Sequence, residues 1–67
     1  MSEKELCKIA KAMVEDEMTG IKEYAAMIEV AKDARAYSLV PKLIIAQNDE
    51  KRHASNLANF ISLHCKR

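Results

Sequence analysis

Apolar side chains recur at every third or fourth position along two long segments of this chain, and this spacing limits its fold more than any other feature. The spaced positions of the first segment are Leu6, Ile9, Met13, Glu17, Gly20/Ile21, Tyr24, Ile28 and Ala31. Those of the second are Val40, Leu43, Ala46/Gln47, Glu50, His53, Leu57, Phe60/Ile61 and His64. Such spacing places side chains on one face of an α-helix. The sequence, which has one glycine and one proline, therefore predicts two long helices, each with an inward face.

Signals for helix ends fall where this spacing begins and where it breaks. Ser2 can cap the first helix, and Glu5 three residues later completes a capping box. The segment DARAYS, residues 33–38, interrupts the spacing. Ser38 can cap the second helix, with Pro41 in its first turn, where a backbone N–H is not needed. A short turn between long helices gives an antiparallel hairpin. We expect an all-α, single-domain chain with helices at about residues 3–33 and 39–64.

A single hairpin cannot bury all the apolar side chains of this chain. Further apolar residues lie outside the inward faces, namely Val14, Met18, Ala25, Met27, Ile44 and Ile45. A chain of 67 residues also buries a small fraction of its surface. We therefore expect self-association, most simply as a two-fold homodimer that forms a four-helix bundle, or as an assembly of such dimers.

Charge and hydropathy argue against several kinds of partner. The chain has 11 basic and 10 acidic residues, which are scattered, so no nucleic-acid partner is expected. No stretch reaches the roughly 18 apolar residues of a membrane span, so no membrane partner is expected either. The first residues, MSEKELCKIAK, lack the apolar middle of a signal peptide. We therefore expect a cytoplasmic protein.

Cys7 and Cys65 lie at similar distances from the predicted turn, one on each helix, so they should be neighbours at the open end of the hairpin. Two cysteines are too few for a disulfide scaffold, and a reducing cytosol favours two free thiols. A redox-sensitive disulfide and a secondary metal site are the alternatives.

Three polar residues interrupt the inward faces at the same depth. Glu17 lies about 24 Å before the end of the first helix, and Glu50 and His53 lie about 17 to 21 Å after the start of the second, at about 1.5 Å per residue. Glu50 and His53 are three positions apart, so they share a face. Carboxylates that are buried together repel one another and lose their hydration, so they need a proton or a cation.

A dimer doubles this set to four glutamates and two histidines, which is the ligand set of two-metal carboxylate bundles. Oxygen donors with a few imidazoles suit iron or manganese. We therefore expect two iron ions per dimer, with manganese as the alternative, bound by Glu17, Glu50 and His53 of both chains.

Three further residues lie close to these predicted ligands in the sequence. Asp49 can accept a hydrogen bond from the partner subunit's His53, and Arg52 can hold the Asp49 carboxylate. Tyr24, two turns after Glu17, can donate a hydrogen bond near the site or relay an electron. The alternatives are a solvent-exposed ion pair between Asp49 and Arg52, and a core position for Tyr24.

The segment DEKRHA, residues 49–54, resembles the Asp-Glu-x-Arg-His motif of ferritin-like di-iron proteins. The wider pattern, with Glu-x6-Tyr in the first helix and Glu-x-x-His in the second, looks like the first helical pair of rubrerythrin. It also resembles encapsulated ferritins, two-helix chains that build a di-iron site across a dimer interface. The resemblance covers about residues 13–57 and implies a ferritin-like four-helix bundle. It implies iron ligands at Glu17, Glu50 and His53, supporting groups at Asp49 and Arg52, and a nearby tyrosine at Tyr24.

The function that this resemblance implies is ferroxidase activity in iron handling or oxidative-stress protection. The reaction would be oxidation of Fe²⁺ by O₂ or peroxide, with an external reductant to reset the site. Two other functions stay open on the sequence. The chain can be a metal-binding module without turnover, which buffers metal or uses it to lock an oligomer, or a plain helical interaction protein.

Overall fold

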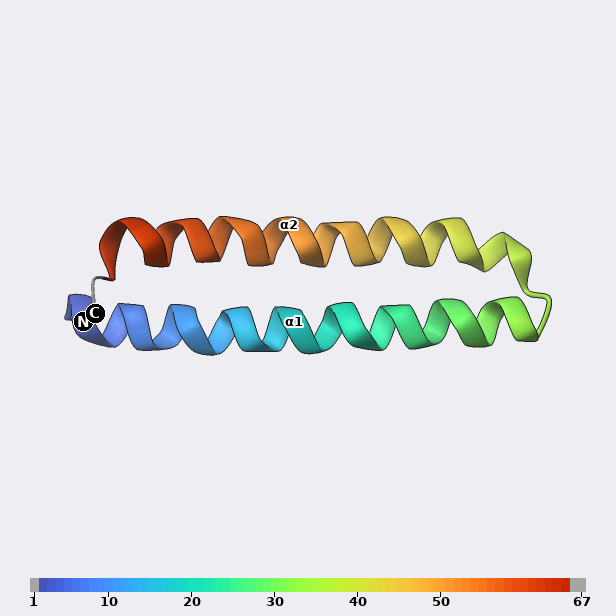
Figure 1. Cartoon of the computed structure of the whole chain (residues 1–67), viewed down its shortest axis with the longest axis horizontal. Helices are drawn as coiled ribbons and strands as arrows, with labels where there is room; N and C mark the ends of the chain where they lie inside the picture. Colours follow the sequence, from blue (N-terminus) through green and yellow to red (C-terminus); the bar gives the residue numbers. More distant parts are fainter. Residues whose placement is uncertain (1, 66–67) are drawn as a thin grey trace.

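The computed structural model describes residues 2–65 and shows an antiparallel pair of long helices (Figure 1). Helix α1 spans Glu3–Asp33, a 3₁₀ turn, η1, spans Tyr37–Leu39, and helix α2 spans Val40–His64. The two helices lie side by side along their lengths, in a molecule of 48 × 18 × 14 Å. The predicted all-α hairpin is confirmed, with both helices bounded within a residue of their expected positions.

The predicted capping box at the start of α1 is confirmed. The Glu5 backbone N–H donates to Ser2 Oγ at 3.1 Å, and the Ser2 backbone N–H donates to Glu5 Oε1 at 2.9 Å. The hydrogen bond from the Ser2 backbone, with a second from the Ser2 hydroxyl, holds the pKa of Glu5 below its usual value. These hydrogen bonds satisfy backbone N–H groups at the start of α1 that have no partner within the helix. They therefore define where α1 begins.

Helix α1 ends in a Schellman motif, with Arg35 in the left-handed region at φ 59°. The Arg35 N–H donates to the Lys32 carbonyl at 3.0 Å, and the Ala36 N–H donates to the Ala31 carbonyl at 2.8 Å. Glycine usually occupies the position that Arg35 holds, because a Cβ is disfavoured in this region. The chain reverses here without a glycine, so the end of the helix had no glycine signal in the sequence.

The expectation that Ser38 caps the second helix is wrong. The residue before α2 is Leu39, which makes no side-chain capping hydrogen bond, and Ser38 lies within η1. The Leu39 N–H already donates to Ala36, the Val40 N–H donates to Tyr37, and Pro41 has no N–H. The 3₁₀ turn therefore leaves few donors for a serine side chain to satisfy.

The contact between the two helices buries little of the chain. Among the described residues, the buried side chains are Ala10, Ile28, Ala31 and Ala54. Larger apolar side chains stay exposed over both helices and the turn, namely Leu6, Ile9, Met13, Met18, Met27, Val30, Tyr37, Leu39, Ile44, Ile45 and Leu63. The small seam residues let the helices approach closely, but most apolar surface remains outside the seam. Within the described residues, neither helix is apolar enough over a sufficient length to span a bilayer.

Candidate metal centre

The two glutamates predicted to bind metal meet at the seam between the helices. Glu17 of α1 and Glu50 of α2 are both half-buried. A hydrogen bond shared with Glu17 raises the pKa of Glu50, and lost hydration and the negative charge of Glu17 add to the effect. Asp49 also raises this pKa, whereas His53 lowers it. Two carboxyl groups can share a hydrogen bond only when one of them carries a proton. The position of Glu17 therefore favours the protonated form of Glu50.

One oxygen of Glu17 is buried without a hydrogen-bond partner among the described residues. His53 Nδ1 lies 3.7 Å from this Oε1 atom, which is too long for a hydrogen bond. The Glu17 side chain is 20% exposed and that of His53 is 52% exposed. A buried carboxylate oxygen without a donor is costly. Within the described residues, this Glu17 oxygen therefore lacks the donor that a buried carboxylate oxygen ordinarily has.

Gly20 gives Glu50 the room to reach this position. A Cβ built on Gly20 would lie 2.7 Å from Glu50 Oε1 and 3.2 Å from Glu50 Cδ. The φ angle of Gly20 is not positive, so the residue is not required by the backbone conformation. A glycine inside a helix costs about 1 kcal/mol relative to alanine. The close approach of the Glu50 carboxylate gives a physical reason for a glycine at this point.

The neighbouring residues occupy different environments. Arg52 Nη2 lies 3.2 Å from Asp49 Oδ1, in an ion pair whose side chains are 66% and 50% exposed. The expected contact between these two residues is present on the surface. Tyr24 is half-buried, and within residues 2–65 its hydroxyl makes no hydrogen bond to Glu17, Glu50 or His53. Asp49 and Arg52 therefore lie where a second chain could reach them, whereas no hydrogen bond among the described residues joins Tyr24 to the carboxylates.

A cross-helix hydrogen bond beside the site was not expected from the sequence. Gln47 Nε2 donates to the Ile21 carbonyl at 3.1 Å, and Gln47 is half-buried. This bond ties α2 to α1 one turn before Glu50. The available signal was the polar residue at an inward position of the second helix. Because inward polar residues need partners, Gln47 could have been predicted to hold the register of the two helices.

One hairpin brings Glu17, Glu50 and His53 to the same level, as predicted. Within the part of the chain that the structure describes, no group of three or more His, Cys, Asp or Glu side chains is arranged to hold a metal ion. His53 is on the exposed side of α2, while the carboxylates are in the seam. A complete two-metal site of the predicted kind needs donors from a second copy.

Cys7 and Cys65 are joined by a disulfide, so the expectation of two free thiols is wrong. Their Cα atoms are 5.7 Å apart, within the usual range for a disulfide. The expected proximity at the open end is therefore confirmed, and it is this proximity that allows the bond. Sulfurs bonded to each other do not provide thiolate ligands, which removes the alternative of a cysteine metal site in this form. The His64 ring packs on Phe60, with centroids 4.9 Å apart.

Comparisons with protein-family models, curated proteins and solved structures gave no match.

Proposed function

We propose that two copies of this chain form a ferritin-like four-helix bundle that binds two iron ions and oxidises Fe²⁺. The ligands would be Glu17, Glu50 and His53 of both chains. The observation that carries this proposal is the position of Glu17, whose buried Oε1 atom has no hydrogen-bond partner among the described residues and whose carboxyl group neighbours that of Glu50. A carboxyl pair in a helix seam is unfavourable unless a proton or a cation compensates it.

A series of residues on one side of each helix supports the dimer. On α1 the series is Ile9, Met13, Gly20 and Met27, and on α2, with Leu39 just before it, the series is Leu39, Ala46, His53 and Phe60. Spacings of four and seven residues keep each series on one helix face. Met27 and Leu39 line the same apolar groove of about 420 Å³, which joins the two series at the turn end of the hairpin. We call these two series together the apolar flank.

Four large apolar side chains of the apolar flank are exposed. Ile9, Met13 and Met27 are 44%, 45% and 49% exposed, and Leu39 is 49% exposed. His53 belongs to the same flank, so a second copy docked there would meet the imidazole and the seam carboxylates together. An isologous dimer would place the two half-sites on opposite sides of the two-fold axis. The flank thus supports both self-association and completion of the site.

The charges of the combined ligand set suit two divalent cations. Four deprotonated glutamates carry four negative charges, which two divalent ions neutralise. Carboxylate oxygens and imidazole nitrogens are donors for iron, with manganese as the alternative. When bound, each pair of Fe²⁺ ions supplies two electrons, which reduce O₂ to hydrogen peroxide or reduce peroxide to water. Release of the ferric product, or an external reductant, would restore the starting site.

The remaining residues would orient the ligands. The exposed Asp49 carboxylate would accept a hydrogen bond from the partner subunit's His53, and Arg52 at 3.2 Å would hold that carboxylate in place. Tyr24, which is half-buried on α1, would border the site without taking part in a proton or electron step. We place the activity in the cytoplasm, as expected from the sequence. Since disulfides are rare there, the Cys7–Cys65 bond would form under oxidative conditions.

The test adds Fe²⁺ to the protein in the absence of oxygen, then admits air and measures the oxygen consumed. Wild-type protein should consume O₂ in proportion to the added Fe²⁺, faster than buffer alone. Glu17→Leu should lose this activity, and Glu15→Leu, a change at an exposed position two residues away, should keep it. If wild type binds iron but oxidises it no faster than buffer, the chain is a metal-binding module without turnover. If Glu17→Leu consumes O₂ at the wild-type rate, the assigned site is wrong.

A further inference from the structure

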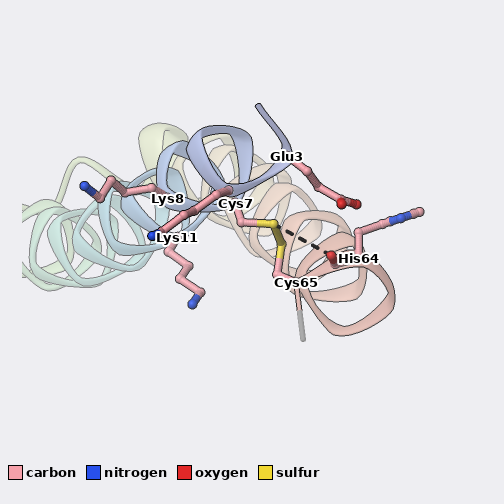
Figure 2. Close-up of a pocket in the computed structure, with 7 residues that line it drawn as sticks. Glu3, Cys7, Lys8, Lys11, His64 and Cys65 are labelled. Atoms are coloured by element: carbon pink, nitrogen blue, oxygen red, sulfur yellow. Dashed lines mark hydrogen bonds between the residues drawn. A yellow bond between two sulfur atoms is a disulfide. The ribbon is translucent and has the colours of Figure 1, made fainter. Parts of the chain in front are cut away.

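A shallow cavity of about 550 Å³ at the open end of the hairpin contains both sulfurs of the Cys7–Cys65 disulfide (Figure 2). The other residues that line it are Glu3, Lys4, Lys8, Lys11 and His64. Both cysteines are half-buried, so the bond faces the cavity and is not enclosed in a core. A small molecule can therefore reach a sulfur–sulfur bond from solvent.

The charge of this cavity is predominantly positive. Lys4 and Lys11 are three positions before and four after Cys7, which places them on the Cys7 side of α1, and Lys8 follows Cys7 directly. None of these lysines forms an ion pair with any residue in the range 2–65. The one carboxylate of the lining, Glu3, extends toward His64 and away from Lys8 and Lys11 (Figure 2). Anions are therefore favoured in the cavity.

The two sulfurs have different surroundings. Cys7 shares the lining of the cavity with three lysines, whose positive charge favours a thiolate there. Cys65 is the C-cap of α2. It lies at the negative end of the helix dipole, which disfavours a thiolate on Cys65. The His64 carbonyl oxygen is 3.8 Å from Cys7 Sγ (dashed in Figure 2), a contact that becomes a hydrogen bond only when that sulfur carries a proton. The better leaving group of this disulfide is therefore Cys7.

We propose that Cys7–Cys65 is a redox-active disulfide that exchanges with negatively charged small-molecule thiols. The incoming thiolate attacks Cys65 Sγ, the sulfur–sulfur bond breaks, and Cys7 leaves as a thiolate in the cavity that the lysines line. The mixed disulfide on Cys65 then reacts with a second thiol, which releases the small-molecule disulfide and the reduced chain. Two thiols are oxidised, the protein disulfide gains two electrons, and the two thiol protons are taken up by the protein or solvent. The imidazole of His64 extends away from the sulfurs and takes no part (Figure 2).

The site is independent of the proposed metal centre, since Cys7 is about 15 Å from Glu17 along α1 at about 1.5 Å per residue. The exchange should therefore proceed at the same rate in the Glu17→Leu variant. This variant separates the two proposals, because it removes iron oxidation and leaves the disulfide and its lysines in place.

The experiment measures reduction of the disulfide by glutathione, which is anionic, by neutral β-mercaptoethanol and by cationic cysteamine, with each rate divided by the thiolate concentration. Glutathione should react fastest at low salt, and its advantage should shrink as salt is added. In the K4Q/K8Q/K11Q variant, the ratio of the glutathione rate to the rates of the other two thiols should fall by about tenfold. The matched variant K22Q/K42Q/K51Q, which removes three exposed lysines elsewhere, should keep it.

The second readout is the position of the mixed disulfide. After a brief reaction with glutathione, alkylation and mass spectrometry should find glutathione on Cys65 and the alkyl group on Cys7. Equal rates for the three thiols, or equal losses in the two lysine variants, would overturn the selectivity for anionic thiols. Glutathione found mainly on Cys7 would overturn the assigned direction of attack.

Discussion

The carboxylate of Glu50 fills the space in which a side chain at Gly20 would lie, since its Oε1 atom is 2.7 Å from the position of a Cβ on Gly20. Gly20 is three residues after Glu17, on the same side of α1. The missing side chain therefore lies beside the carboxyl group that Glu50 meets. A register in which a glycine of one helix faces a glutamate of the other is what brings the two carboxyl groups together in this fold.

Gly20→Ala should separate stability from metal binding. Alanine in place of a helical glycine should raise the free energy of unfolding of the metal-free protein by up to about 1 kcal/mol. The added Cβ would displace the Glu50 carboxylate, which is the flexible end of its side chain and can move at little cost. Iron or manganese binding should weaken, as measured by calorimetric titration. Thr19→Ala, at an exposed neighbouring position, is the control and should leave metal binding unchanged. Undiminished affinity in Gly20→Ala would contradict the placement of Glu50.

Glu50→Gln should change how stability depends on pH in the metal-free protein. Because the pKa of Glu50 is raised in the folded chain from its ordinary 4.5, the folded state binds this proton more tightly than the unfolded state does. The stabilisation is present below pH 4.5 and is lost as pH rises through the raised pKa. Glutamine does not titrate, so in urea unfolding the variant should gain on wild type as pH rises from 4.5 through the raised pKa of Glu50. Glu15→Gln, at an exposed position, should follow wild type. A constant difference at all pH values would refute the carboxyl pairing.

Arg35→Gly should stabilise the turn. Arg35 has a φ of 59°, where a side chain costs roughly 1–2 kcal/mol, and glycine is the preferred residue at this position of a Schellman motif. Part of this gain is offset by the greater freedom of glycine in the unfolded chain, so the expected increase is about 1 kcal/mol. In a chain of this size, that corresponds to a rise of roughly 4–8 °C in Tm. Arg35→Ala is the control and should give no such rise, and a lower Tm for Arg35→Gly would count against the observed turn.

Loss of the Cys7–Cys65 bond should cost a large part of the stability. The cysteines are 58 residues apart, and closing a loop of that length is worth about 4 kcal/mol in the chain-entropy account. With four buried side chains among the described residues, a reduced hairpin should depend on association with a second copy. The Tm of the C7S/C65S variant should therefore rise with protein concentration. If the C7S/C65S variant is as stable as wild type and its Tm does not change with protein concentration, both the Cys7–Cys65 bond and the dimer would be contradicted.

The sequence predicted the parts of this fold that depend on local patterns. The spacing of apolar residues located α1 and α2, and Ser2 with Glu5 marked the first helix start. Ser38 misled because a 3₁₀ turn had already satisfied the donors that a serine cap serves. Arg35 gave no signal, because its left-handed conformation depends on how the following helix returns to the first one and not on its residue type.

The sequence was enough to predict the position of the candidate site along the helix axes, but not the contacts between its side chains. Distances from the turn were enough to place Glu17, Glu50 and His53 at one depth, because the rise of a helix is constant. The approach of Glu50 to Gly20 depends on the rotation of each helix about its axis, which residue spacing does not determine. The proximity of Cys7 and Cys65 followed from the same counting. Whether neighbouring thiols are oxidised depends on their surroundings and on the redox compartment, neither of which a sequence pattern contains.

The most direct test of the central proposal is elemental analysis of the purified protein together with its mass in solution. The proposal predicts a dimer, or a multiple of one, that contains two iron ions for every two chains. Glu17→Leu should reduce the iron content to background and still leave a dimer, because the apolar flank is unchanged. A wild-type protein that is a monomer and carries no metal after incubation with Fe²⁺ under anaerobic conditions would contradict the proposal.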